Sequence, residues 1–127
     1  MATVEFDLKA GLKTSADGAD IIRRHVVLGE LSANDLLEAA RESELVLDFN
    51  GEPVLVSSDA LLGVHLLRRR IKKIDDLPGP IPLSLLGKLG EDDIELIQKK
   101  ADELKKAMAI VKKVQNEGRS EGGSASD

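Results

Sequence analysis

Hydrophobic and polar positions alternate near the N-terminus, as a strand with one solvated face requires. Residues 3–8 place apolar side chains between polar or acidic ones. Residues 21–28 form a second run that is rich in β-branched residues. Gly11 and residues 15–18 supply turn residues between the two runs. The pattern therefore predicts an N-terminal β-hairpin and leaves its register open.

A short helix and a second hairpin are predicted next. Ser32 and Asp35 have the spacing of a capping box, which predicts that a helix begins there. Residues 45–56 then contain two apolar runs joined by Asn50-Gly51, a pair that tolerates the positive φ angles of a tight hairpin turn. Pro53 has no amide hydrogen, so its strand is expected at the edge of a sheet.

The next segment predicts a helix over residues 59–74 that is apolar on one face and basic on the other. Ser57 or Ser58 is the expected N-cap, and the proline-rich segment 78–82 prevents the helix from continuing. Arg70 falls within the apolar face. Its charge must therefore extend to water, meet a carboxylate, or lie beyond the end of the helix.

A short helical turn over 82–86 and a long final helix complete the pattern. The final helix begins at the acidic triplet 91–93, where the helix dipole favours negative charge. Its apolar stripe is too short for a coiled coil and is typical of a core-facing helix. We predict an α+β fold in which one or more N-terminal β-hairpins pack with three to four helices. Residues 1–115 form a single domain, and the Gly/Ser-rich residues 116–127 form a disordered tail.

Composition narrows the classes of function. The chain has 127 residues, of which 42% are hydrophobic and 32% charged, as in an ordinary globular domain. Its only aromatic residues are Phe6 and Phe49, which argues against a platform that stacks nucleic-acid bases. The absence of cysteine removes disulfides, thiolate metal sites and cysteine nucleophiles. The N-terminal segment has no secretory signal pattern, and no apolar run approaches the roughly 18 residues of a membrane span.

Charge is unevenly distributed along the chain. The net charge is −5, and residues 28–60 carry eight acidic residues against one base. Residues 68–73 hold five bases in six positions. Either the acidic and basic segments face each other or solvent, or the basic segment is a contact patch. Nucleic-acid binding through this patch is disfavoured by the net charge and by the lack of a helix-turn-helix pattern.

No pattern of catalytic or cofactor-binding residues is present. His25 and His65 lie 40 positions apart, and the glycines form no phosphate-binding loop. Ser57 and Ser58 are explained by helix capping. The acidic triplet 91–93 offers oxygen ligands for a divalent cation, but its place at a helix start explains it. We therefore predict that the chain is not an enzyme and has no metal or cofactor site.

Two motifs carry a resemblance to a known family. Residues 35–39 read D-L-L-E-A, and residues 83–97 follow L-x-x-L-x-x-L-x-x-x-D-x-x-x-L, with Asp93 and Ile97 at the closing positions. In order of elements and in these motifs, residues 3–108 resemble the tail assembly chaperones of Mu-like and P2-like contractile-tailed phages. Residues 60–104 are the specific part. The Asn50-Gly51 hairpin has no place in that family pattern.

The resemblance implies a non-catalytic role in the host bacterial cytoplasm. Such a chaperone keeps the tape measure protein soluble until tail tube subunits polymerise around it, and it is absent from the mature virion. The tail tube protein, a longer frameshifted form of the chain and self-association are further implied partners. The expected contact residues are apolar and basic positions of the two long helices: Leu62, Leu66, Leu67, Arg68, Arg69, Lys72, Lys73, Leu104, Met108 and Val111.

Two other functions remain open on the sequence. A nucleic-acid-associated regulator would use residues 68–73 and would bind duplexes with a strong salt dependence. A structural tail or connector component would instead remain in the purified virion.

Overall fold

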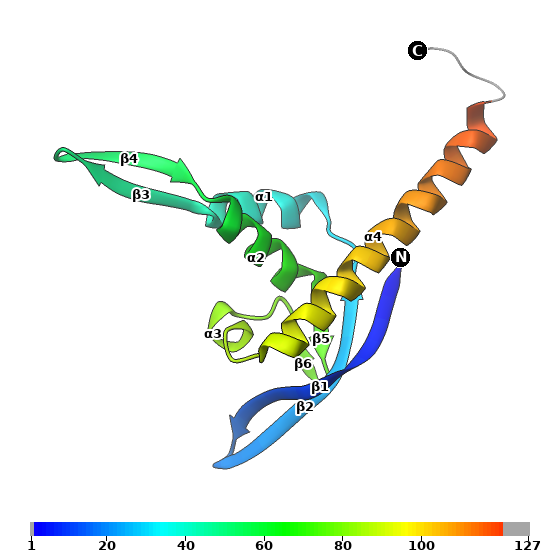
Figure 1. The fold of residues 1–127 in the computed structure, drawn as a ribbon, viewed down its shortest axis with the longest axis horizontal. Helices are drawn as coiled ribbons and strands as arrows, with labels where there is room; N and C mark the ends of the chain where they lie inside the picture. Colours follow the sequence, from blue (N-terminus) through cyan, green and yellow to red (C-terminus); the bar gives the residue numbers. More distant parts are fainter. Residues whose placement is uncertain (1, 121–127) are drawn as a thin grey trace.

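The computed structural model describes the backbone of residues 2–120 and the side chains of residues 2–110 and 113 (Figure 1). The fold is α+β, as predicted, with N-terminal antiparallel strands and a long C-terminal helix. In chain order the elements are β1 (Thr3–Ala16), β2 (Ala19–Gly29), α1 (Ala33–Glu42), β3 (Glu44–Phe49), β4 (Glu52–Ser57), α2 (Asp59–Arg70), β5 (Ile71–Ile74), β6 (Leu77–Pro78), α3 (Leu83–Leu86) and α4 (Glu91–Ser120).

The main sheet has the antiparallel order β1-β2-β5-β6. The predicted N-terminal hairpin is confirmed and is longer than the pattern indicated, because β1 continues through Gly11 to Ala16. An irregularity in the pairing between Asp7 and Leu12 makes this continuation possible. Gly11 has φ of +93° there, and a Cβ atom would lie 2.6 Å from Cγ2 of Ile22. Only glycine fits this position without strain.

The helix predicted over residues 59–74 ends at Arg70, and residues 71–74 form the strand β5 instead. Ile71 and Ile74, three positions apart, fitted one face of a helix. In the structure a register shift opposite Val27 and Leu28 lets both isoleucines be fully buried while β5 pairs with β2. Burial of two isoleucines against the sheet outweighs one further turn of helix.

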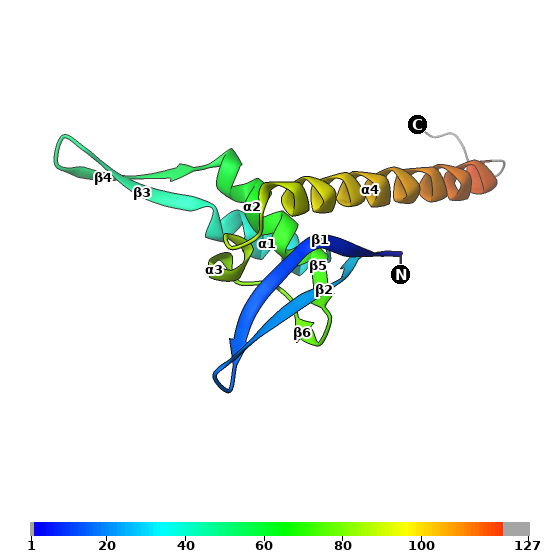
Figure 2. The same ribbon diagram turned by 60° about the horizontal axis from the view of Figure 1, so that its bottom comes forward.

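The core lies between the main sheet and the first half of α4. Ile97, Ala101 and Leu104 of α4 pack on the sheet residues Leu12 and Val26 within one buried cluster. Beyond this contact α4 continues away from the sheet (Figure 2). Residues 116–120, predicted to be tail, belong to this helix, and residues 121–127 lie outside the described part.

The second predicted hairpin is present as a separate two-stranded sheet, β3–β4. It projects from the body of the molecule at the end opposite to the distal half of α4 (Figures 1 and 2). No helix among residues 2–120 is both long enough and apolar enough to cross a membrane.

Candidate functional site

Among the described residues, the β3–β4 hairpin carries six of the thirteen exposed large apolar side chains. Asn50 and Gly51 take φ of 55° and 85° at its tip, as their sequence predicted. Cross-strand partners share a face of a sheet, so Leu45–Val56 and Leu47–Val54 lie on one face, next to Phe49. The pair Val46–Leu55 lies on the other face. Both faces therefore carry apolar side chains.

Solvent reaches both faces of this hairpin. Val46, Leu55 and Phe49 are 69%, 63% and 54% exposed, and every residue of β3 is exposed. A two-stranded sheet is only marginally stable when nothing covers it. Exposed contiguous apolar surface marks interaction sites in soluble proteins. The chemical capacity of the hairpin is therefore to bind apolar surface of another chain.

The charges on the hairpin are all of one sign. Residues 44–57 contain Glu44, Asp48 and Glu52, all exposed, and no basic residue. A surface of this composition complements apolar segments that carry lysine or arginine.

The base of the hairpin is held by ion pairs between α1 and α2. Glu42 accepts hydrogen bonds from Nη2 of Arg68 at 2.5 Å and from Nη2 of Arg69 at 2.9 Å. Burial raises the pKa of Glu42, but the Arg69 hydrogen bond and the charges of both arginines outweigh it, and the pKa is lowered overall. The carboxylate of Asp35 accepts a hydrogen bond from the amide of the N-cap residue Ser32, and its Oδ1 lies 3.4 Å from Nη1 of Arg69. The cluster fixes both helices from which β3 and β4 extend.

These ion pairs change the interpretation of the basic segment. Arg68 and Arg69 pair with Glu42, and Nζ of Lys72 lies 3.7 Å from Asp35. The acidic and basic segments face each other, as the first interpretation of the charge pattern had it. Lys73 alone of the expected basic contact residues is exposed.

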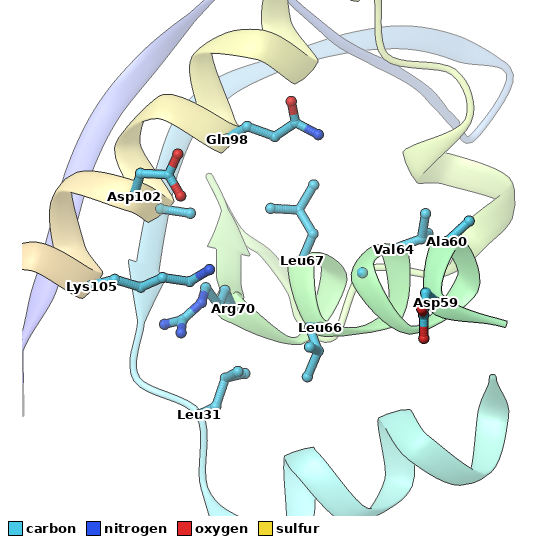
Figure 3. Close-up of a pocket in the computed structure, with 12 residues that line it drawn as sticks. Leu31, Asp59, Ala60, Val64, Leu66, Leu67, Arg70, Gln98, Asp102 and Lys105 are labelled. Atoms are coloured by element: carbon cyan, nitrogen blue, oxygen red, sulfur yellow. The ribbon is translucent and has the colours of Figure 1, made fainter. Parts of the chain in front are cut away.

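A groove of about 350 Å³ lies between α2 and α4 (Figure 3). Leu31, Leu66 and Leu67 form its apolar walls, and Arg70 and Lys105 also line it. Arg70 is the last residue of α2 and is only 9% exposed. Its Nη1 donates to the Gly29 carbonyl at 3.3 Å. Burial lowers the pKa of Arg70, because desolvation outweighs the longer-range attraction of Glu30.

The apolar residues predicted to contact a partner occupy three environments. Leu62, Leu66 and Leu67 are half-buried, and Leu66 and Leu67 face the groove. Leu104 is 2% exposed and belongs to the core, so its surface is not available in this fold. Met108 is half-buried against the core. The side chain of Val111 lies outside the described residues.

Sequence reasoning did not include the β3–β4 hairpin in the candidate site. The signal was present, because residues 45–47 and 54–56 are apolar at consecutive positions instead of alternating. A strand that is apolar at consecutive positions carries apolar side chains on both faces, and each face is either covered by another element or exposed. A sequence does not show which of the two holds, since that depends on whether another element lies over the hairpin.

Asp93, the closing residue of the second motif, is an anchor inside the fold. Its side chain is 1% exposed and accepts hydrogen bonds from the backbone amides of Lys9 at 2.6 Å, Ala10 at 3.1 Å and Gly11 at 2.9 Å. These amides lie in the irregular part of β1, where they have lost their strand partners. The motif therefore joins the start of α4 to β1.

An exposed apolar hairpin on a small, ion-paired domain is a surface of the kind that marks interaction sites. The comparisons place the chain in a family of phage tail assembly proteins. Residues 8–119 match the model of the family described as tail assembly protein gp41. The chain belongs to this family, the gp41 tail assembly proteins of Mu-like phages.

Individual relatives agree with this assignment. The chain is 34% identical over 88 residues to the probable tail assembly protein gp41 of Escherichia phage Mu, which covers 69% of this chain and 61% of that protein. The chain is also 34% identical over 88 residues to the probable tail assembly protein FS-gp41 of Escherichia phage Mu. This match covers 69% of this chain and 47% of that protein. The Mu-like prophage FluMu protein gp41 of Haemophilus influenzae is 35% identical over 103 residues, which cover 80% of this chain and 81% of that protein.

The chain thus spans about half to three fifths of the length of the two phage Mu relatives. No solved structure matches the chain.

Proposed function

We propose that this tail assembly protein is a chaperone that binds the tape measure protein and keeps it soluble during tail assembly, without catalysis. The observation that carries the proposal is the β3–β4 hairpin, which is apolar and exposed on both faces. A chaperone for a long apolar client needs apolar surface that can be covered reversibly, flanked by charge that keeps the free protein soluble. The hairpin and its three carboxylates have both properties.

The geometry of the hairpin favours its insertion between segments of the client over packing of the client against one face alone. Because each face carries apolar residues, contact with a client on one face would leave the other face in water. A client that covers both faces, with helices above and below, buries the whole element. Lysine or arginine residues of the client would then pair with Glu44, Asp48 and Glu52.

The contact residues that the sequence predicted on the two long helices contribute less to the proposed client contact than the hairpin does. Leu66 and Leu67 lie in the groove, and Met108 and Lys73 are partly or fully accessible on the body. They extend the contact only if the client reaches past the base of the hairpin. Arg68 and Arg69 keep α1 and α2 together in the free protein.

The test is co-expression with the protein encoded by the long open reading frame downstream of this gene. We expect that protein to be insoluble alone and soluble in complex with this chain. The double variant Val46→Thr, Leu55→Thr removes the most exposed facing pair of the hairpin and keeps β-propensity. It should lose most of the co-purified client.

Ile22→Thr is the matched control, because Ile22 is an exposed strand residue of the other hairpin at 54% exposure. It should retain the client. A client that stays insoluble beside the wild-type chain contradicts the chaperone function. Equal retention by the double variant and the control contradicts the assignment of the hairpin.

A further inference from the structure

An uncovered hairpin of this kind is a liability in the free protein. Both of its strands are edge strands, and its faces are apolar. Such elements promote aggregation unless something covers them. The same chain carries an apolar groove in which two basic residues, Arg70 and Lys105, could pair with a carboxylate of the hairpin.

This groove is the one between α2 and α4. Its apolar walls include Leu66 and Leu67, and it lies between two helices with a volume of about 350 Å³, which accommodates an apolar side chain of the hairpin. Figure 3 shows Arg70 and Lys105 pointing toward the same part of this groove from α2 and α4. Asp102 lines the groove on the same face of α4, and Asp59 lies at its far end.

Arg70 is the strongest sign that the groove accepts a carboxylate. In the part of the chain that the structure describes, Arg68 and Arg69 pair with carboxylates, whereas Arg70 donates only to a backbone carbonyl. No buried side-chain nitrogen among the described residues lacks a partner, so the remaining N–H groups of Arg70 reach solvent through the groove. A guanidinium whose N–H groups have no carboxylate partner can form strong, charge-assisted hydrogen bonds to a carboxylate that enters the groove.

We propose that the β3–β4 hairpin of one copy of this chain occupies the α2–α4 groove of a second copy. The ring of Phe49 packs on the Leu66 and Leu67 walls, and Glu52, which is the cross-strand partner of Phe49 and shares its face, lies against Arg70 and Lys105. The hairpin carries three acidic residues and no base, which gives the charge complementarity of the contact.

The contact must be between copies. The hairpin extends from the N-terminal end of α2 and points away from the body that holds its own groove (Figures 1 and 2). The contact joins two different surfaces, hairpin and groove, so it is not self-complementary by itself. A client that takes the hairpin competes with it, and the free protein keeps its apolar element covered until a client arrives.

The test is sedimentation of the purified chain over a range of concentrations, without a client. We expect wild-type protein to reach at least twice the monomer mass.

Phe49→Thr alters only the hairpin, and Lys105→Glu alters only the groove at an exposed position of α4. Each variant should bind itself at least about tenfold more weakly and remain monomeric. Ile22→Thr, matched to Phe49 in exposure at 54%, should behave as wild type.

Mixing the two variants is the decisive step. Phe49→Thr keeps an intact groove and Lys105→Glu keeps an intact hairpin, so an equimolar mixture should form a species of two chains. Arg70→Met is a second groove variant, and it should behave as Lys105→Glu does in the same mixture. A monomeric wild type, variants that associate like wild type, or a mixture that stays monomeric would each overturn the proposal.

Because no client is present, this result does not depend on the chaperone function. Lys105→Glu separates the two proposals further, since it should lose self-association and still bind the tape measure protein.

Discussion

The two β-hairpins of this protein both carry apolar side chains but have opposite environments. The β1–β2 hairpin joins a four-stranded sheet, and α4 covers its apolar face with Leu12 and Val26 fully buried. The β3–β4 hairpin projects from the body with Val46 and Leu55 exposed. The first hairpin therefore derives its stability from the fold, whereas the apolar residues of the second contribute little to it.

The difference shows where stability and function lie in the chain. Burial of the first hairpin requires an internal anchor at Asp93, which satisfies the amides of its irregular segment. The second hairpin has its own anchor only at its base, where Glu42 joins α1 and α2. Substitutions in the first hairpin should thus affect unfolding, and substitutions in the second should affect binding.

The largest expected effect is the loss of the Asp93 anchor. Asp93→Ala leaves three buried or partly buried amides without acceptors, which should lower the free energy of unfolding by about 3–5 kcal/mol. Urea denaturation followed by circular dichroism measures the change. Asp92→Ala is the matched control, because Asp92 is exposed in the same helical turn and should change stability by less than about 0.5 kcal/mol. Equal effects of the two variants would show that Asp93 is not an anchor.

A smaller effect is expected at the base of the second hairpin. Glu42→Gln removes the charge that pairs with Arg68 and Arg69 and should cost about 1 kcal/mol. Because the folded-state pKa of Glu42 is lowered, its stabilisation is present above the unfolded pKa and is lost as pH falls through the folded value. The difference between wild type and Glu42→Gln in urea midpoint should therefore shrink toward acidic pH. A difference that stays constant with pH would exclude the ion pairs as its cause.

On the solvated face of the first hairpin, His25 forms pH-sensitive hydrogen bonds to two carboxylates. Hydrogen bonds to Glu5 and then to Asp7 raise the pKa of His25 above its ordinary value of 6.5. Its stabilisation is therefore complete below the unfolded pKa and is lost as pH rises through the folded value. NMR titration of the His25 ring should give a raised pKa, and Glu5→Gln should bring it back toward 6.5. An unchanged titration in Glu5→Gln would remove Glu5 as the cause.

The smallest effect on stability is expected where the largest effect on binding is expected. In the Lys105→Glu background, where self-association is expected to be lost, Val46→Thr with Leu55→Thr should change the free energy of unfolding by no more than about 0.5 kcal/mol, because both side chains are exposed in the single chain. Urea denaturation of this variant beside Lys105→Glu alone measures the change. A loss of several kcal/mol would mean that the hairpin is part of the core in solution.

Local signals predicted most of the elements. The capping box at Ser32, the Asn50-Gly51 turn and the acidic start of α4 each depend on neighbouring residues, and the structure contains all three. The segment 71–74 was predicted as helix because Ile71 and Ile74 fit a helical spacing, whereas their burial depends on the distant strand β2.

The candidate site was harder to predict for the same reason. Whether Leu104 is core or contact surface, and whether Arg68 finds Glu42, depends on contacts between residues far apart in the sequence. The exposure of the β3–β4 hairpin follows from the absence of a covering element over residues 44–57 among the described residues. A pattern of apolar positions does not show whether another element of the chain covers a hairpin.

The most direct test of the central claim is hydrogen exchange of residues 44–57 with and without the tape measure protein. In the Lys105→Glu background, where self-association is expected to be lost, only a bound client would cover the hairpin. The account predicts rapid exchange in the free chain and strong protection of residues 44–57 in the complex. Protection that falls on the body while residues 44–57 still exchange rapidly would contradict it.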